Sequence, residues 1–457
     1  MRHGIAQPLP VDQAVKRPAV SVSPKGRQGV IVLTSSIFFG LVLGHAVTSS
    51  GQTPEPSEPA AAAASDFEEL PELKASEILK PEILKGPHHT VRELVPTSAG
   101  MNQFVIDSDF GVFDADGNEM LLRRIKEVYS IAQLKEVSRT DQFKQSLLTA
   151  ARGPYIAAKH VVEDPGGAVS SASKGIMKFM GRAGQTVKNV GKGRSEKSSG
   201  GDTAEQVIGY TKTKRKIATE MGIDPYSTNA VLQKELDGVA WASWGGGFTF
   251  SAATFPISGP VGAALTMTSV SDTLGELLNE KSPTELKAVN RSALRAMGAS
   301  AKDTERFLNN TAFSPTQQTA FVLNLKTMDG VANRGAFVRA AAEKSSNESD
   351  AVFCVQTAML MGKLHGDHPL ARIAMIENFP ICIAKDGTVT VALQWDYAAW
   401  TSGAAAFTEQ VQKLATESVE PRPVMVAISG QVSPRLRQEL QSRGFTVRDR
   451  MSPGPLK

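Results

Sequence analysis

The chain has 457 residues but only two cysteines, Cys354 and Cys382, and it lacks the short motifs that mark common enzymes. There is no G-x-S-x-G, P-loop, H-E-x-x-H, C-x-x-C or G-x-G-x-x-G arrangement in a suitable context. The sequence therefore offers no motif for nucleophilic, phosphate-binding or zinc chemistry. An even cysteine count allows one disulfide in an oxidising compartment. Both cysteines have apolar neighbours, which equally suits two buried thiols.

The body of the chain also lacks net charge, although the whole sequence carries +4. Residues 1–46 contain five Lys or Arg and one Asp, so they account for the entire excess. The remaining chain sums to zero, which argues against a nucleic-acid-binding body.

Lys and Arg are absent from Gln28 to Leu73, and the apolar stretch Gly29–Ala46 begins this interval. A basic start, an apolar run and small residues at Gly44-His45-Ala46 are typical of a signal peptide. We predict that residues 1–46 are a cleaved signal peptide or a retained N-terminal anchor. Residues 47–68 are expected to be a disordered Pro/Ala linker. Either reading exports the body, to the periplasm or anchored to the inner membrane facing the periplasm.

Charge is missing again over 26 residues, from Gly245 to Val270. Pro256, Pro260 and five glycines would break a spanning helix and leave backbone groups unpaired in lipid. A catalytic loop would need more than hydroxyl groups. We expect this segment to be buried against helices, with a membrane-dipping hairpin as the alternative.

Periodicity divides the body into four parts. We predict a small α+β N-terminal unit at 69–167, a basic Gly-rich flexible segment at 168–202, a helical core domain at 203–368 and a C-terminal α/β unit at 369–457. The fold class follows as mainly α, a bundle of short helices with a small C-terminal α/β unit, and α+β overall.

Strands are expected in two places. In "NQFVIDSDFGVFDADGNEMLLRRI" we expect two short strands, a turn at Asp114–Gly117 and then a helix. In the C-terminal unit, apolar or alternating runs predict strands at 370–376, 379–384, 388–395, 422–430 and 445–451.

The segment 174–216 contains 11 Lys or Arg against three acids. Basic and apolar side chains alternate at its start. The candidate contact residues are Lys174, Ile176, Met177, Lys178, Phe179, Met180 and Arg182. Such a pattern would attract an anionic membrane surface or an acidic protein partner, although a solvated loop has the same composition.

The histidines and the one calcium-loop-like stretch are better explained as structural features than as metal sites. His365 and His368 have metal-ligand spacing, but Gly366 and Pro369 are expected to break the helix there, so a loop is favoured. His88 and His89 mean little alone. Phe113–Met120 resembles half a calcium loop, but Ile125 stands where the bidentate Glu should be.

Ser429 and Ser433 lie at a strand-to-helix turn. There, Ser433 before Pro434 is more simply an N-cap than a nucleophile.

Four stretches, "FVIDSDFGVFDADG", "DPYSTNAVLQKELDGVAWASWGGG", "FSPTQQTAFVLNL" and "VAISGQVSPRLRQELQSRGF", resemble a family of exported bacterial proteins with no established activity. The resemblance runs from about Val91 to Arg450 and implies one exported protein of several parts. It implies no cofactor and no catalytic residue.

The expected function is an exported, envelope-associated binding or structural protein that is not an enzyme. No cofactor, nucleic acid or small-molecule ligand is indicated. The alternative is a hydrolase with an active site in the C-terminal unit, where Ser429 or Ser433 would be the nucleophile.

Overall fold

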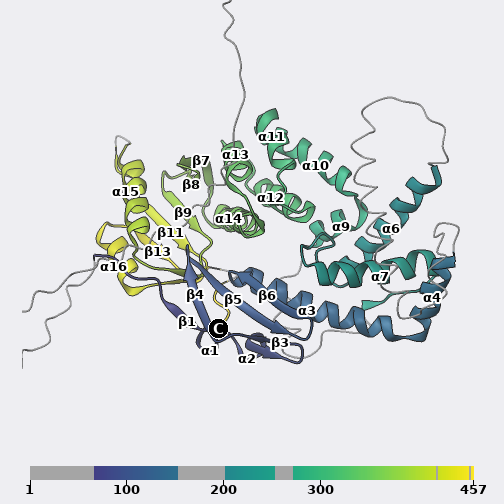
Figure 1. Ribbon diagram of the computed structural model, residues 1–457. Helices are drawn as coiled ribbons and strands as arrows, with labels where there is room; N and C mark the ends of the chain where they lie inside the picture. Colours follow the sequence, from purple (N-terminus) through teal and green to yellow (C-terminus); the bar gives the residue numbers. More distant parts are fainter. Residues whose placement is uncertain (1–65, 153–200, 253–270, 418–419, 452–453) are drawn as a thin grey trace, which may run out of the picture. The chain divides into compact units, whose positions relative to one another are not determined.

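The structure is a computed structural model that describes residues 66–152, 201–252, 271–417, 420–451 and 454–457 (Figure 1). The described residues form 14 helices and 13 strands in three sheets, of six, two and five strands. Of the described residues, 54% lie in helices and 19% lie in strands. The prediction of a mainly α fold is wrong, because the N-terminal part builds a complete sheet where only two strands were expected. The fold class is α+β.

The N-terminal sheet is antiparallel, with β5 at its centre. Its elements are β1 (Glu72–Lys74), α1 (Ala75–Ile78), α2 (Pro81–Leu84), β2 (Lys85–Gly86), β3 (His89–Val91), β4 (Leu94–Ser98), β5 (Met101–Ser108) and β6 (Gly111–Asp116). Along β5, Phe104 and Ile106 are buried, whereas Gln103 is exposed. This period-two pattern leaves one face of the sheet in water.

The expected turn at Asp114–Gly117 lies elsewhere. The β5–β6 turn is at Asp109 and Phe110, where the Ser108 Oγ accepts a hydrogen bond from the Phe110 N–H at 3.1 Å. Asp114 and Asp116 belong to β6 and alternate with the buried Ala115. The two aspartates face solvent from an edge of the sheet. Their polar side chains next to a glycine made this part of the strand resemble a turn.

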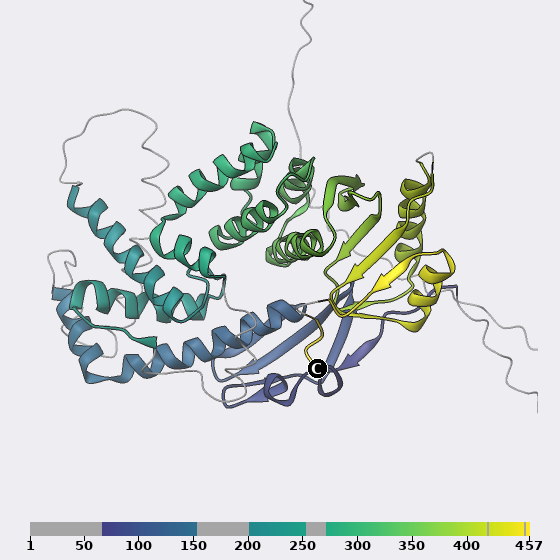
Figure 2. The same cartoon turned by 180° about the vertical axis from the view of Figure 1, so that it is seen from behind.

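Helix α3 (Asn118–Arg139) packs on β5 and β6, and Figure 2 shows it running from this sheet toward a helical layer. That layer contains α4 (Asp141–Arg152), α6 (Gly201–Glu220) and α7 (Ala230–Gly246). The Asn229 side chain caps α7 by accepting the Val231 and Leu232 N–H groups. Helix α7 contacts α3, α4 and α6, so its apolar face forms the centre of this core.

The uncharged stretch that starts at Gly245 enters the same core. Gly247 ends α7 in the left-handed conformation, with φ 71°. Phe248 is buried, and Phe250 and Ala252 pack against the cluster formed by α4, α6 and α7. Residues 253–270 of the stretch lie outside the described residues.

Six helices follow, and the four from 283 to 344 form two stacked hairpins. Their bounds are α9 (Asp272–Glu280), α10 (Pro283–Ala296), α11 (Ala301–Leu308), α12 (Pro315–Thr327), α13 (Arg334–Lys344) and α14 (Glu348–Asp367). Helices α10 and α12 both begin with Ser-Pro-Thr and a capping box, at Ser282 and Ser314, 32 residues apart. Helix α10 packs on α12, α11 on α13 and α12 on α14, so each hairpin buries its apolar face against its neighbour.

The five-stranded C-terminal sheet has the order β13-β11-β9-β8-β7, in which β9, β11 and β13 are parallel. Its elements are β7 (Leu370–Ile376), β8 (Phe379–Ala384), β9 (Val389–Leu393), β11 (Val424–Ile428) and β13 (Thr446–Arg448), with α15 (Ser402–Thr416) and α16 (Pro434–Ser442). The two-stranded sheet pairs β10 (Tyr397–Ala398) with β12 (Gln431–Val432).

Both faces of this sheet are covered, by α15 and α16 on one side and by α13 and α14 on the other (Figure 1). Large side chains such as Val391 and Val426 face α15 and α16. Small ones such as Cys382, Ala392 and Ala427 face the helical hairpins. The small side chains let α13 and α14 approach the strands closely.

Candidate functional site

The carboxyl ends of β9 and β11 form the candidate ligand-binding or active site of the C-terminal sheet. The two strands are parallel neighbours, so the loops that follow them meet at one edge of the sheet. In open α/β sheets, ligands bind at such an edge. The loops here contain Ser429 and Ser433, the two serines proposed as nucleophiles, and Asp396, which the sequence analysis missed.

Both serines are buried and serve the fold. Ser429 is 3% exposed, and its hydroxyl donates to the Trp395 carbonyl at 2.8 Å. Ser433 is 1% exposed and caps α16, since its Oγ accepts the Leu436 N–H at 3.0 Å. The Ser433 hydroxyl donates to the Glu68 carboxylate at 2.6 Å. The N-cap reading of Ser433 is confirmed.

Asp396 joins the C-terminal sheet to the start of α3. Its carboxylate accepts the Asn102 N–H at 3.1 Å and the Asn118 N–H at 3.0 Å. Burial, only partly offset by these two hydrogen bonds, raises the pKa of Asp396 to about 7. The nearby Glu119 carboxylate adds to the rise in the pKa.

The N-terminal part of the chain fills the remaining space at this edge. The Gly100 carbonyl accepts hydrogen bonds from the N–H groups of Asp396 at 2.8 Å and Tyr397 at 3.2 Å. A Cβ at Gly430 would lie 1.9 Å from the Asp396 carbonyl oxygen, so only glycine allows the loops to meet. The Glu68 carboxylate also accepts the Trp400 N–H at 2.5 Å. The edge is thus closed by backbone and by the hydrogen-bonded side chains of Glu68, Asp396 and the two serines.

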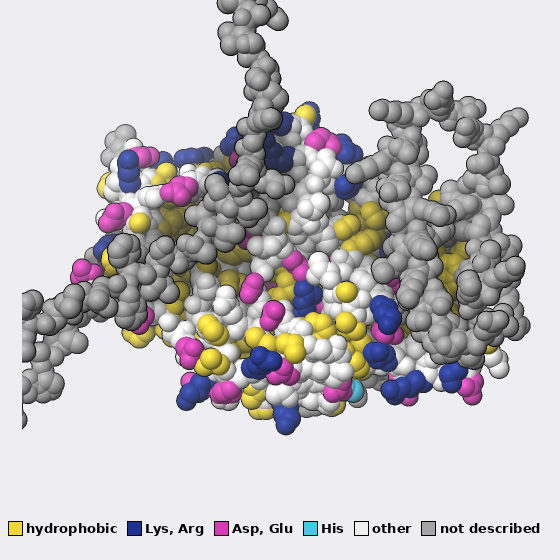
Figure 3. Space-filling view, in the orientation of Figure 1, with side chains coloured by type: hydrophobic (Ala, Val, Ile, Leu, Met, Phe, Trp, Pro, Cys, Tyr) yellow, Lys and Arg dark blue, Asp and Glu magenta, His cyan; other side chains and the backbone are white. Residues whose placement is uncertain are grey.

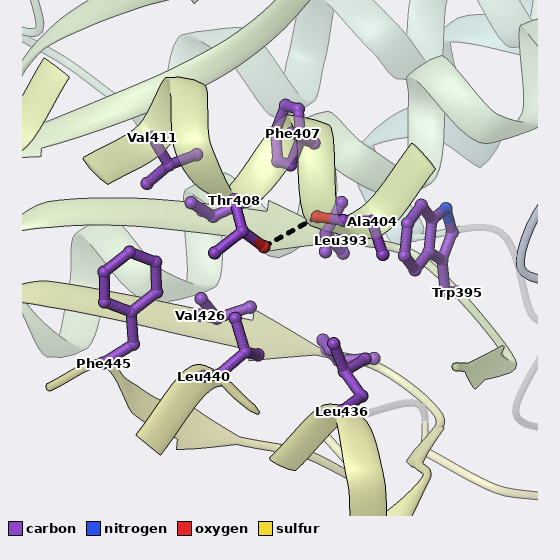
Figure 4. Close-up of a pocket in the computed structure, with 12 residues that line it drawn as sticks. Leu393, Trp395, Ala404, Phe407, Thr408, Val411, Val426, Leu436, Leu440 and Phe445 are labelled. Atoms are coloured by element: carbon purple, nitrogen blue, oxygen red, sulfur yellow. Dashed lines mark hydrogen bonds between the residues drawn. The ribbon is translucent and has the colours of Figure 1, made fainter. Parts of the chain in front are cut away.

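A small apolar pocket lies behind this edge, between the sheet and helices α15 and α16 (Figure 4). Its volume is about 30 Å³, and Leu393, Phe407 and Leu440 are among its walls. The only lining hydroxyl, that of Thr408, donates to the Ala404 carbonyl at 2.7 Å within α15. With no ionisable group in its lining, the pocket is suited to packing rather than to chemistry.

The histidines of the described residues do not converge. Helix α14 continues through Gly366 to Asp367, so the expected helix break at Gly366 is wrong. His365 accepts the Leu370 N–H at 3.0 Å, and His368 contacts Asp386 at 3.1 Å.

The other two histidines lie in the N-terminal part, His88 in the turn between β2 and β3 and His89 at the start of β3. His88 contacts Asp109 at 2.9 Å, and His89 contacts the Ile83 carbonyl at 2.8 Å. Burial lowers the pKa of His89. Within the described ranges, no group of three His, Cys, Asp or Glu residues could hold a metal ion.

The two cysteines are free thiols in the structure. Cys382 is fully buried on the small-residue face of β8, and burial raises its pKa to about 12. Cys354 lies in α14, where its sulfur is 3.5 Å from the Ser345 hydroxyl oxygen. Burial raises the pKa of Cys354 to about 11. Neither thiol is activated as a nucleophile.

The basic segment is only partly described. The seven candidate contact residues, Lys174, Ile176, Met177, Lys178, Phe179, Met180 and Arg182, lie outside the described residues. At the other end of the 174–216 stretch, Lys214 and Arg215 belong to α6 and are 8% and 5% exposed. The Lys214 ammonium pairs with Asp237 at 2.5 Å. These two cations therefore stabilise the helical layer and are not free to meet an anionic surface.

Among the helices that the structure describes, none is both long and apolar enough to cross a bilayer. In Figure 3, Lys and Arg side chains are interspersed with Asp and Glu over the described part of the face shown. Comparisons with family models, curated proteins and solved structures found no match to this chain.

Proposed function

We propose that this is an exported, envelope-associated protein that binds rather than catalyses, and that it contacts an anionic membrane surface through residues 168–202. The single observation that carries the non-catalytic half of the proposal is the closed edge at the ends of β9 and β11.

A catalytic group must be within reach of a substrate atom and free to exchange a proton or form a bond. Here the hydroxyl groups of Ser429 and Ser433 are almost fully buried, and each donates to an internal acceptor. The Asp396 carboxylate is engaged by two backbone N–H groups. Asp396 links the C-terminal sheet to β5 and α3, Ser433 binds Glu68, and Ser429 joins the two loops of the edge, which supports a structural role for the edge.

The membrane half of the proposal rests on composition. Seven cations lie between Lys174 and Lys197, beside Ile176, Met177, Phe179 and Met180. Each cation near an anionic bilayer contributes about 1 kcal/mol, and burial of apolar side chains adds to it. The charge contribution decays within a Debye length, so binding should be sensitive to salt.

Sedimentation of the full chain with vesicles tests this half. Anionic vesicles at low salt should pellet the protein, whereas neutral vesicles or high salt should not. The variant K174E/K178E/R182E should stay in the supernatant. A matched control, K302E/K344E/K385E, has the same change in charge at exposed positions outside residues 168–202 and should still pellet.

Absence of pelleting with anionic vesicles at low salt would contradict membrane contact. Equal loss in both triple variants would show that overall charge, rather than this segment, drives the association. An acidic protein partner would then be the remaining candidate for the segment.

The alternative, a hydrolase, has one observation in its favour: the Ser433 hydroxyl lies 2.6 Å from a carboxylate, that of Glu68. A carboxylate beside a hydroxyl can act as a general base. However, the Ser433 Oγ also accepts the Leu436 N–H as the cap of α16, and only 1% of the residue is exposed. The pair therefore lacks an open side from which a substrate could approach.

A further inference from the structure

A groove of about 280 Å³ lies between α9, α10 and α12. It is separate from the edge of the C-terminal sheet and from the apolar pocket. Each helix contributes side chains spaced three or four residues apart, so one face of each helix lines the groove.

The floor of the groove contains a polar side chain that is only partly used. Asn290 is 2% exposed, and one of its N–H groups donates to the Thr319 hydroxyl at 3.0 Å. Thr319 in turn donates to the Pro315 carbonyl at 2.8 Å. Among the described residues, no partner is present for the Asn290 carbonyl oxygen. A buried amide with a free acceptor matches the N–H of a peptide backbone.

The rim of the groove is acidic. Glu276 and Glu280 are exposed and lie one turn apart on the face of α9 that lines the groove. No ion pair engages either carboxylate within the described ranges. Lys326 stands on α12 as the single lining cation. Two carboxylates against one ammonium favour a cationic ligand and disfavour nucleic acid.

The walls between floor and rim are apolar. Val289 is 39% exposed although it lines the groove, and Leu323 is only partly buried. Apolar side chains left open in a concave site gain free energy when another apolar group covers them. The groove thus combines an apolar wall, an acidic rim and a backbone-like hydrogen-bonding group.

We propose that this groove binds a peptide segment in which a Lys or Arg neighbours an aliphatic side chain. The cation meets Glu276 and Glu280, the aliphatic group packs on Val289 and Leu323, and the peptide backbone donates to Asn290. This inference goes beyond membrane contact and does not depend on residues 168–202.

The test is fluorescence polarisation of the full chain with two labelled hexapeptides, one alternating Lys and Leu and the other alternating Glu and Leu. The Lys-Leu peptide should bind about tenfold or more tightly than the Glu-Leu peptide, a difference of about 1.4 kcal/mol. In E276Q/E280Q this preference should disappear. In V289W, at a position that is 39% exposed, both peptides should lose affinity because the indole fills the groove.

The matched control E69Q/E409Q removes two exposed carboxylates elsewhere and should behave as wild type. The proposal is overturned if wild type binds neither peptide or binds both alike. It is also overturned if V289W and E276Q/E280Q, with unchanged circular dichroism, bind the Lys-Leu peptide as wild type does.

Discussion

The N-terminal and C-terminal sheets differ in how many faces they bury. In β5 of the N-terminal sheet, buried and exposed residues alternate because α3 covers only one face. In β9 and β11 of the C-terminal sheet every residue is buried, because helices cover both faces. A strand's burial pattern thus reports how many layers surround it.

The largest expected effect contrasts the two faces of the N-terminal sheet. Phe104 is 1% exposed on the inner face, so Phe104→Ala should lower the free energy of unfolding by about 3–5 kcal/mol. The neighbouring Gln103→Ala, on the solvent face, should change it by less than about 0.5 kcal/mol. Urea unfolding measures both. Similar losses would mean that the outer face is also covered, which would remove the contrast between the sheets.

In the C-terminal sheet, the face covered by α13 and α14 should not tolerate larger side chains. Ala392 is fully buried against the helical hairpins, where small residues permit close packing. Ala392→Leu should therefore destabilise the protein by about 1–3 kcal/mol through overpacking. Val112→Leu, at a 57% exposed position of the N-terminal sheet, serves as the control and should be neutral in the same measurement.

Asp396 links the two sheets, and its side-chain oxygen should contribute to the stability of the protein as a hydrogen-bond acceptor. At pH 5, Asp396→Ala leaves the N–H groups of Asn102 and Asn118 without a partner and should cost about 1–3 kcal/mol relative to Asp396→Asn. The Asn variant keeps an oxygen at the same place. Equal stabilities of the two variants would show that the sheets are joined without this contact.

The same residue should give a pH dependence of stability. The folded pKa of Asp396, about 7, lies above its ordinary value of 3.8, so the folded state retains a proton that the unfolded state has released. Wild-type stability should therefore fall relative to Asp396→Asn as pH rises from about 4 to about 7, by at most about 1.4 kcal/mol per pH unit. Urea midpoints of both proteins across this range test it. A constant difference would contradict the raised pKa.

The smallest effect concerns the thiols. Cys354 and Cys382 should resist alkylation in the native protein at pH 7, since burial raises both pKa values above 10. In urea without reductant, mass spectrometry should find both alkylated. A species that requires reductant would establish the disulfide instead.

Structure could be predicted from the sequence where a strand shows its own apolar pattern, or where a side chain bonds to a residue a few positions away. Apolar runs located the C-terminal strands β7, β8, β9, β11 and β13, and Ser433 was read correctly as a cap. It failed in the N-terminal sheet, where strands such as β2 and β3 have two or three residues, too few to show alternation. A short strand is specified by its partners across the sheet rather than by its own sequence.

The contacts that close the strand edge could not be predicted, because they join residues far apart in the chain. Asp396 accepts a hydrogen bond from Asn102 across 294 residues, and Ser433 donates one to Glu68 across 365 residues. One local signal was glycine: at Gly430 the backbones approach too closely for a side chain, and at Gly100, which has a positive φ, a side chain would collide with the Trp395 indole. A polar residue shortly after a buried strand, such as Asp396 three residues beyond the end of β9, was the other available hint.

Labelling of the native full chain with a fluorophosphonate probe, read by peptide mass spectrometry, tests the closed edge most directly. The probe reacts with serine hydroxyls that are both exposed and activated. We expect no adduct at Ser429 or Ser433 in the wild type, and the same result in Glu68→Gln. An adduct at Ser433 that disappears in Glu68→Gln would show that the edge is open and that Glu68 activates Ser433, as a hydrolase requires.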